Sequence, residues 1–285
     1  IPGVRHLHRV TSTPWNIHVL VVDVTNPHVR VGALIKNESG DADTLGETTS
    51  GMASRHNALA AINGDYFEST GTKNHVPQGI CIYDGTYLTQ TGFVTNRVSW
   101  AMNGATLESF VNVYGTTYPY TAPSWITNAV SGGPRFLRSG AVSIENTAGL
   151  PDAYSRQPRT AIGISQNKKT LFLATVDGRQ SGFSVGMTSP EFGTLLLELG
   201  AWDAINFDSG GSTTFYLNGA VRNRPSEGAE RRVANAVAVW DTFDQGPNPA
   251  VTVGTGFENP PFVTGTIRSQ DGWSGGGTTC AIQST

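Results

Sequence analysis

Carboxylates stand at three points of this 285-residue chain where an apolar run meets glycine. Each of these segments follows a run that is typical of a buried strand: Asn63-Gly64-Asp65, Asp177-Gly178-Arg179 and Asp208-Ser209-Gly210-Gly211-Ser212. One such site would be an ordinary turn, because Asp-Gly is a common turn dipeptide. Glycine also lets backbone N–H groups approach a ligand closely. Three sites at comparable points predict loops gathered at one sheet edge, and both interpretations stay open for Asp208.

Short strands must position these loops. The β-branched runs Ile17–Val24 and Val29–Ile35, separated by Asn-Pro, predict a pair of neighbouring strands. The run Ala58–Ile62 predicts a buried strand that stops at Asn63. Further strands are expected at Val94–Met102, Arg159–Ile164, Thr170–Val176 and Trp202–Phe207.

Only two helical patterns interrupt the strands. Thr44 and Glu47 have the spacing of a capping box and lead into a short helix around Met52–His56. The clearer helix spans Ser189–Leu199, where Phe192, Leu195, Leu196 and Leu199 fall on one face and Gly200 follows as a C′ glycine. Many strands and few helices predict an α+β fold, with a large, mainly antiparallel sheet on which the Ser189–Leu199 helix packs.

The sequence divides near residue 243. Residues 1–243 are expected to form a single catalytic domain, and 244–250, rich in Gly, Pro and Asn, are expected to be a linker. The Gly- and Thr-rich tail, 251–285, is too short for its own core and fits the start of a carbohydrate-binding or β-sandwich module.

Charge and composition exclude several classes of protein. A net charge of −3 offers no basic field for nucleic acid, and no apolar run approaches the ~20 residues that a membrane span needs. Cys81 and Cys280 form no CxxC pair, which argues against a zinc knuckle and leaves a disulfide or two buried thiols open. We expect no cofactor, and metal dependence stays open.

Several features favour secretion. The chain begins at Ile1-Pro2, as a processed exported protein would, it has only four lysines, and it carries the sequon Asn37-Glu38-Ser39. We therefore expect an extracellular protein.

An ordered set of motifs between about residues 15 and 241 resembles the phosphodiester glycosidase family. The set comprises Asn63-Gly64-Asp65-Tyr66-Phe67, Ser131-Gly132-Gly133-Pro134, Arg159-Thr160-Ala161-Ile162-Gly163, Asp177-Gly178-Arg179, Gly186-Met187-Thr188 with Glu191, Asn206-Phe207-Asp208-Ser209-Gly210-Gly211-Ser212-Thr213-Thr214 and Glu230-Arg231-Arg232-Val233-Ala234-Asn235-Ala236. The chain departs from the family where it has Asp208-Ser209-Gly210 in place of Asp-Gly-Gly. The resemblance implies a carbohydrate or glycosyl-phosphate substrate.

Cleavage of the C1–O bond of a sugar-1-phosphodiester passes through an oxocarbenium-like transition state and releases a phosphate monoester. That leaving group is a weak base, with a second pKa near ~6, so a strong general acid is less necessary than in other glycosidases. The chemistry needs a cation for the phosphate and a carboxylate that stabilises C1 or activates water.

Particular residues could meet these needs. Arg159 and Arg231 could hold the phosphate bidentately, although a surface role is the alternative for Arg159. The Gly210 and Gly211 amides, with the Ser209 and Ser212 hydroxyls, could complete the anion cradle.

Asp208 is the first candidate for the catalytic carboxylate. Glu191 is a second candidate, but its spacing from Thr188 also fits a helix cap. Asp65 is either a second acid or a ligand of a sugar hydroxyl, and Asn63 is a ligand or an orienting amide. Thr160 and Asp177 complete the residues expected to bind substrate, with an ordinary turn as the alternative for Asp177.

Two other functions stay open. The same scaffold could carry an ordinary exo- or endo-glycosidase that degrades a bacterial polysaccharide, because a fold does not determine function. It could also be a non-catalytic carbohydrate-binding protein that uses Trp15, Trp125, Trp202 and Tyr66 as stacking platforms.

Overall fold

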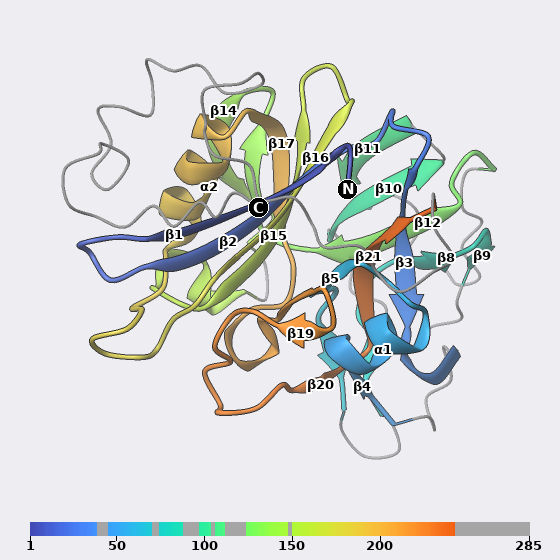
Figure 1. Ribbon diagram of the computed structural model, residues 1–285. Helices are drawn as coiled ribbons and strands as arrows, with labels where there is room; N and C mark the ends of the chain where they lie inside the picture. Colours follow the sequence, from blue (N-terminus) through green and yellow to red (C-terminus); the bar gives the residue numbers. More distant parts are fainter. Residues whose placement is uncertain are drawn as a thin grey trace.

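Antiparallel sheets form most of the chain (Figure 1). The structure, a computed structural model, describes residues 1–38, 45–69, 74–87, 97–103, 106–111, 124–147 and 150–242. The largest sheet has seven strands, in the spatial order β1 (Val4–Val10), β2 (Asn16–Asp23), β16 (Thr170–Val176), β15 (Arg159–Ser165), β17 (Ala201–Asn206), β13 (Arg135–Arg138) and β14 (Ala141–Glu145).

Two five-stranded sheets lie beside it. One contains β11 (Thr106–Val111), β10 (Val98–Asn103), β12 (Asn128–Gly132), β8 (Cys81–Tyr83) and β9 (Thr86–Tyr87). The other contains β19 (Ala220–Val221), β18 (Phe215–Leu217), β5 (Ala60–Asn63), β21 (Asn235–Asp241) and β3 (Val29–Ile35). Two small ribbons pair β20 (Arg232–Val233) with β4 (Glu47–Thr48) and β6 (Phe67–Glu68) with β7 (Val76–Pro77). The predicted α+β class is confirmed.

The two helices cover different sheets (Figure 1). Helix α2 (Ser189–Glu198) packs on β13, β14 and β17, as predicted, and Gly200 follows it with a φ of +100°. Helix α1 (Thr49–Arg55) packs against β5, β18 and β21. Its N-cap is Thr48, whose side chain accepts a hydrogen bond from the Gly51 amide, so the predicted capping box at Glu47 was wrong. Thr44 lies outside the described residues. The short 3₁₀ segments are η1 (Lys36–Glu38), η2 (Pro151–Tyr154) and η3 (Gly210–Ser212).

Strands β2 and β3 are present but do not pair with each other, so the predicted strand pair was wrong. β2 pairs with β1 and β16, whereas β3 pairs with β21 in another sheet. The turn between β2 and β3 therefore carries the chain from one sheet to the next. The predicted strand Val94–Met102 is seen from Val98 onward, and residues 243–285, with the expected linker and tail, lie outside the described residues.

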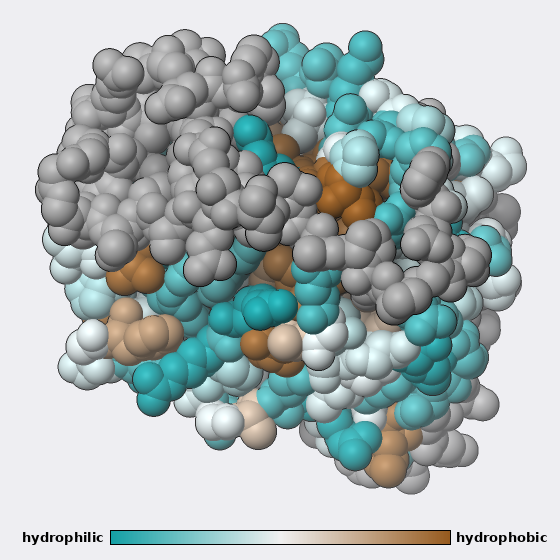
Figure 2. Space-filling model, in the orientation of Figure 1, coloured by the Kyte–Doolittle hydropathy of each residue, from teal (hydrophilic) through white to brown (hydrophobic). Residues whose placement is uncertain are grey.

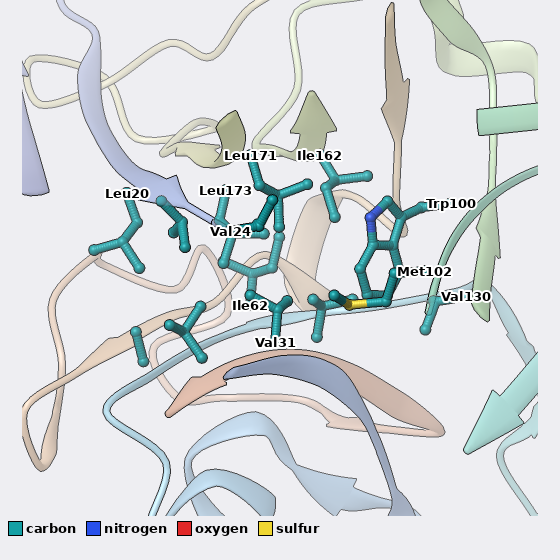
Figure 3. Close-up of a cluster of buried hydrophobic side chains, with 14 of the residues drawn as sticks. Leu20, Val24, Val31, Ile62, Trp100, Met102, Val130, Ile162, Leu171 and Leu173 are labelled. Atoms are coloured by element: carbon teal, nitrogen blue, oxygen red, sulfur yellow. The ribbon is translucent and has the colours of Figure 1, made fainter. Parts of the chain in front are cut away.

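The main core fills the space between the seven-stranded sheet and the two five-stranded sheets. Figure 3 shows Leu20, Ile162, Leu171 and Leu173 facing Val31, Ile62, Trp100 and Met102 from the opposite sheets. Because β16 is covered on its other face by the α2 layer, its residues after Thr170 are all buried. On the face drawn in Figure 2, apolar residues form only small separate patches. No helix in the described ranges is long and apolar enough to cross a membrane.

A stack of three histidines lies on the face of β1 and β2 that adjoins Phe215. The His8 and His18 rings are parallel at 4.2 Å, and His6 Nε2 lies 3.1 Å from His18 Nδ1. His8 Nε2 lies 2.7 Å from Asn16 Oδ1, and Asn16 Nδ2 donates to Asp177. Burial, with the nearby charges of His8 and Arg222, lowers the pKa of His6 to about 4. The pKa of His18 is also lowered, chiefly by burial.

The His6 shift predicts a pH-dependent contribution to stability. Since the folded pKa is below the unfolded value of 6.5, the contribution is full above pH 6.5 and falls as the pH drops to about 4. We expect the difference in unfolding free energy between wild type and His6→Gln to shrink by up to about 3 kcal/mol over this range. Urea unfolding of both proteins measures it. His28→Gln, outside the stack, is the control, and a pH-independent difference would contradict the prediction.

Candidate active site

The amide of Asn63 joins the loops that follow β5 and β17. Its Nδ2 donates to the Asp208 carbonyl at 2.8 Å, and the Asp208 amide donates to the Gly64 carbonyl at 2.8 Å. The Asn63 Oδ1 accepts from Thr160 Oγ1 at 2.7 Å and from the Thr214 amide at 3.1 Å. Asn63 and Thr160 are fully buried, so their side chains hold the loops rather than face solvent.

A cavity of about 240 Å³ opens beside this junction. It contains four of the predicted site residues and several that were not predicted. Its lining consists of Tyr66, Gln78, Arg97, Pro134, Leu150, Asp152, Ala153, Gln157, Arg159, Arg179, Asp208, Ser209 and Gly210. Its volume lies just below the ~300–1,000 Å³ typical of drug-sized ligands, which suits a single sugar ring or phosphate group.

Asp208 lies in this lining with only 9% of its surface exposed. Its Oδ1 accepts from the Ser209 amide at 2.8 Å, and its Oδ2 accepts from the Ser212 hydroxyl at 2.5 Å. Burial raises the pKa of Asp208 to about 6, although Ser212, Arg231 and the Ser209 amide act in the opposite direction. A carboxyl with this pKa can exchange a proton near neutral pH.

Asp65 lies behind the cavity and does not line it. It is completely buried, and its Oδ2 accepts from the Gly79 amide at 2.6 Å. Burial raises its pKa to about 7, and the Asp208 carboxylate adds to the rise, whereas Arg97 and the Gly79 amide lower it. Asp65 can therefore act on the cavity through Arg97 rather than by touching a ligand directly.

The guanidinium of Arg159 is held by backbone carbonyls. Its Nε donates to the Met187 carbonyl at 2.6 Å, and its Nη2 donates to the carbonyls of Asp152, Ala153 and Ser155 at 2.7–3.2 Å. Burial lowers its pKa to about 10. Arg159 thus shapes the segment that closes one side of the cavity, and it contributes charge from within the lining.

Arg231 approaches Asp208 through Ser212. Its Nη1 donates to the Ser212 hydroxyl at 3.3 Å, while its Nη2 pairs with Glu227. A Cβ on Gly211 would clash with Glu227 and with Arg231, so this glycine makes room for that ion pair. Arg231, Gly211 and Ser212 are absent from the cavity lining and support Asp208 from behind.

Gly210 lines the cavity but does not offer its amide to a ligand. Its N–H donates to the Pro158 carbonyl at 2.9 Å. Its φ of +66° is in the left-handed region, and a Cβ there would lie 3.1 Å from the terminal nitrogens of Arg179. The Ser209 hydroxyl donates to Asn206 Oδ1 and the Phe207 carbonyl. The Gly210 amide and the hydroxyls of Ser209 and Ser212, which were expected to bind an anion, therefore already donate hydrogen bonds to acceptors within the protein.

Glu191 and Asp177 lie away from the cavity lining. Glu191 forms the capping box with Thr188, pairs with Arg156 and lines a separate cavity of about 290 Å³. Asp177 accepts hydrogen bonds from Asn16 and Asn223 and from the Arg224 amide. The partners of each carboxylate therefore give it a structural role outside the cavity beside Asp208.

Arg97, Gln78 and Arg179 line the cavity but were not among the predicted site residues. Tyr66, which also lines it, was predicted only as a stacking platform of a carbohydrate-binding protein. Tyr66 and Arg179 belong to two of the motifs that resemble the family, and this membership was the sequence signal that could have identified them. Arg97 directly precedes the apolar strand β10, and a charged residue at the edge of such a run is the only signal that it gives. Gln78 carries none.

A larger groove, of about 490 Å³, lies elsewhere and is lined by Trp240, Tyr83 and Asn128, among others. It contains none of the predicted site residues. The described ranges hold no cluster of three or more His, Cys, Asp or Glu side chains that could bind a metal ion. The chemistry of the lining, rather than cavity size, therefore selects the cavity beside Asp208.

Comparisons with known proteins agree with the motifs. The profile of the family described as "Phosphodiester glycosidase" matches residues 56–240. This chain belongs to the phosphodiester glycosidase family. Membership classes its domain as a hydrolase of the glycosidase type, which confirms the predicted enzyme class.

Individual relatives fit this assignment. The chain is 35% identical over 97 residues, 32% of its length, to the N-acetylglucosamine-1-phosphodiester alpha-N-acetylglucosaminidase of Bos taurus, and covers 18% of that protein. It is 27% identical over 199 residues, 68% of its length, to the SPbeta prophage-derived protein YomE of Bacillus subtilis, and covers 29% of it. The chain thus spans less than a third of each of these relatives.

Solved structures share the fold. The catalytic domain of zebrafish N-acetylglucosamine-1-phosphodiester alpha-N-acetylglucosaminidase, auto-inhibited by its pro-peptide, has a TM-score of 0.66 at 22% identity, with 84% of each chain covered. A hypothetical protein from Synechocystis has a TM-score of 0.63 at 17% identity, covering 83% of this chain and 61% of that one.

The hydrogen bonds of the two serine hydroxyls predict different effects on the pKa of Asp208. Ser212→Ala removes a donor to the carboxylate and should raise the pKa of Asp208 above about 6. The Ser209 hydroxyl donates to Asn206 Oδ1 and the Phe207 carbonyl instead, so Ser209→Ala should leave the pKa of Asp208 unchanged. Carboxyl ¹³C NMR titration measures both, and equal shifts would contradict the assignment.

Proposed function

We propose that this domain hydrolyses the C1–O bond of a sugar-1-phosphodiester, or a closely related bond in a microbial glycan, outside the cell. The observation that carries the proposal is a small cavity in which the Asp208 carboxyl lies with the side chains of Arg97, Arg159 and Arg179. The carboxyl can stabilise or activate attack at the sugar carbon C1, and the guanidinium groups can bind the phosphate on the other side of the scissile bond.

Asp208 supplies the chemistry in its ionised form. It either stabilises positive charge at C1 or accepts a proton from the water that attacks C1, as the C1–O bond breaks. The phosphate monoester leaves as an anion and needs no strong general acid, because its second pKa is near ~6. The arginines hold the phosphate as its charge grows in the transition state.

The comparisons support this substrate class by analogy. The bovine relative and the zebrafish structure are named for hydrolysis of an N-acetylglucosamine-1-phosphodiester. The low number of lysines, four in 285 residues, supports action outside the cell. An exo-acting enzyme fits a cavity of about 240 Å³ better than a long polymer groove does.

Asp208→Asn is the most direct test of the chemistry. The substitution is nearly isosteric, so it should preserve folding and binding but lower turnover of a glycosyl-1-phosphodiester by about 100-fold or more. Mass spectrometry of products from a panel of such substrates gives the rates. Asp203→Asn, on β17 beside Ser139, is the matched control and should retain wild-type turnover.

Three other outcomes would contradict the proposal. Retention of most activity by a folded Asp208→Asn variant would remove Asp208 from the mechanism. Release of sugar from neutral glycosides, with no phosphate detected in a phosphatase-coupled assay, would instead identify an ordinary glycosidase. Sugar binding without turnover of any substrate would identify a carbohydrate-binding protein.

The pKa of Asp208 predicts the acidic side of the pH profile. Because the ionised form is the reactive one, kcat/KM should fall about tenfold per pH unit below about pH 6. Initial rates at low substrate concentration between pH 4 and 8 measure this. Constant kcat/KM down to pH 4.5 would mean that no group with the pKa of Asp208 is needed.

A further inference from the structure

Arg97 is buried at the cavity with unused hydrogen-bond donors. Only 4% of its surface is exposed, and its Nη2 donates to Gln78 Oε1 at 2.8 Å. Its Nε and Nη1 are shielded from solvent and have no hydrogen-bond partner in the described part of the chain. The Cζ atom of its guanidinium lies 4.7 Å from the centre of the Tyr66 ring, within the range of a cation–π interaction. Buried donors without acceptors are costly, so this side chain is arranged for an acceptor that the protein itself does not supply.

The Asp65 carboxylate does not satisfy the hydrogen-bond donors of Arg97. Asp65 attracts it electrostatically, but no hydrogen bond joins the two side chains: Asp65 accepts from backbone amides, and Arg97 donates to Gln78. The charged and titratable groups that face Asp65 are Arg97, Asp208 and the buried thiol of Cys81. The pair is thus attractive at a distance and leaves both groups able to respond to a third charge.

The other arginines of the cavity are less available. Four carbonyls already hold Arg159. Arg179 donates through Nε to Gln157 Oε1 at 2.6 Å and is exposed, so solvent competes for its remaining donors. Arg97 combines spare donors with burial, the conditions under which a charged hydrogen bond is strongest.

We propose that Arg97 is the residue that holds the phosphate group of the substrate, and that the bound anion replaces Asp65 as its counter-charge, so that Asp65 takes up a proton from solvent. This inference rests on the proposed function and names the anion-binding residue of the same cavity. Asp65 is then a positioning residue: it is the counter-charge of Arg97 before the anion binds, and its protonation removes a negative charge from beside the phosphate.

Calorimetric titration with sulfate, which stays dianionic between pH 6 and 8, tests both parts. Arg97→Gln should weaken sulfate binding about 10–100-fold. Arg138→Gln removes the same charge from an exposed site and should not change the affinity. At pH 7 wild type should take up a fraction of a proton on binding, measured in two buffers of different ionisation enthalpy, and Asp65→Asn should take up less.

The outcomes separate this inference from the proposed function. Undetectable sulfate binding by wild type, or equal affinity in wild type and Arg97→Gln, overturns the role of Arg97. Equal proton uptake in wild type and Asp65→Asn overturns the exchange of counter-charge. If wild type binds sulfate through Arg97 but cleaves no phosphodiester, the proposed function fails and the anion site stands. If Arg97→Gln does not fold, Arg97→Lys provides the test, because lysine keeps the charge but loses the bidentate fork.

Discussion

The site depends on one buried amide. The Asn63 side chain donates a hydrogen bond to the Asp208 carbonyl and accepts hydrogen bonds from the Thr160 hydroxyl and the Thr214 amide. It therefore connects strand β15 with the loops after β5 and β17. Strand β5 belongs to one sheet, and β15 and β17 belong to another. Because the amide is fully buried, its loss would leave several polar groups unpaired at once. The hydrogen bond from Asn63 to the Asp208 carbonyl thus helps to fix the position of the Asp208 carboxylate.

Burial gives the cavity its electrostatic character. It raises the pKa of Asp208 to about 6 and of Asp65 to about 7, while Arg97 lowers both. Ser212, backed by Arg231, holds Asp208 closer to its ionised form. The two carboxyls therefore differ by position and partners: one faces the cavity, and the other faces an arginine that lines it.

Local patterns in the sequence were enough to predict helix α2 and the strands β2, β3, β5, β10, β15, β16 and β17, since burial on two faces and a capping box leave marks within ten residues. Other strands, such as β1, β13 and β21, were not predicted. Local patterns could not predict that β3 pairs with β21, because the partners are some 200 residues apart. Three loops were predicted to gather at one sheet edge. Those of Asp65 and Asp208 do meet, but they follow strands of two different sheets, and Asp177 lies outside the cavity lining. The apolar strand that Arg159 opens favoured a role in the site over a surface role, but it did not indicate the backbone carbonyls that hold the guanidinium. Arg97 gave little signal, because its surroundings come from loops distant in sequence.

In the mechanism that we propose, one cavity holds the sugar carbon at Asp208 and the phosphate at Arg97. The most direct measurement is a crystal structure of the Asp208→Asn variant with an intact glycosyl-1-phosphodiester. We expect the anomeric carbon, or a water in line with it, to lie about 3–3.5 Å from the side chain of residue 208, and the phosphate oxygens to accept hydrogen bonds from Arg97. An ordered substrate in the groove beside Trp240, or in this cavity with its phosphate turned away from Arg97, would contradict it.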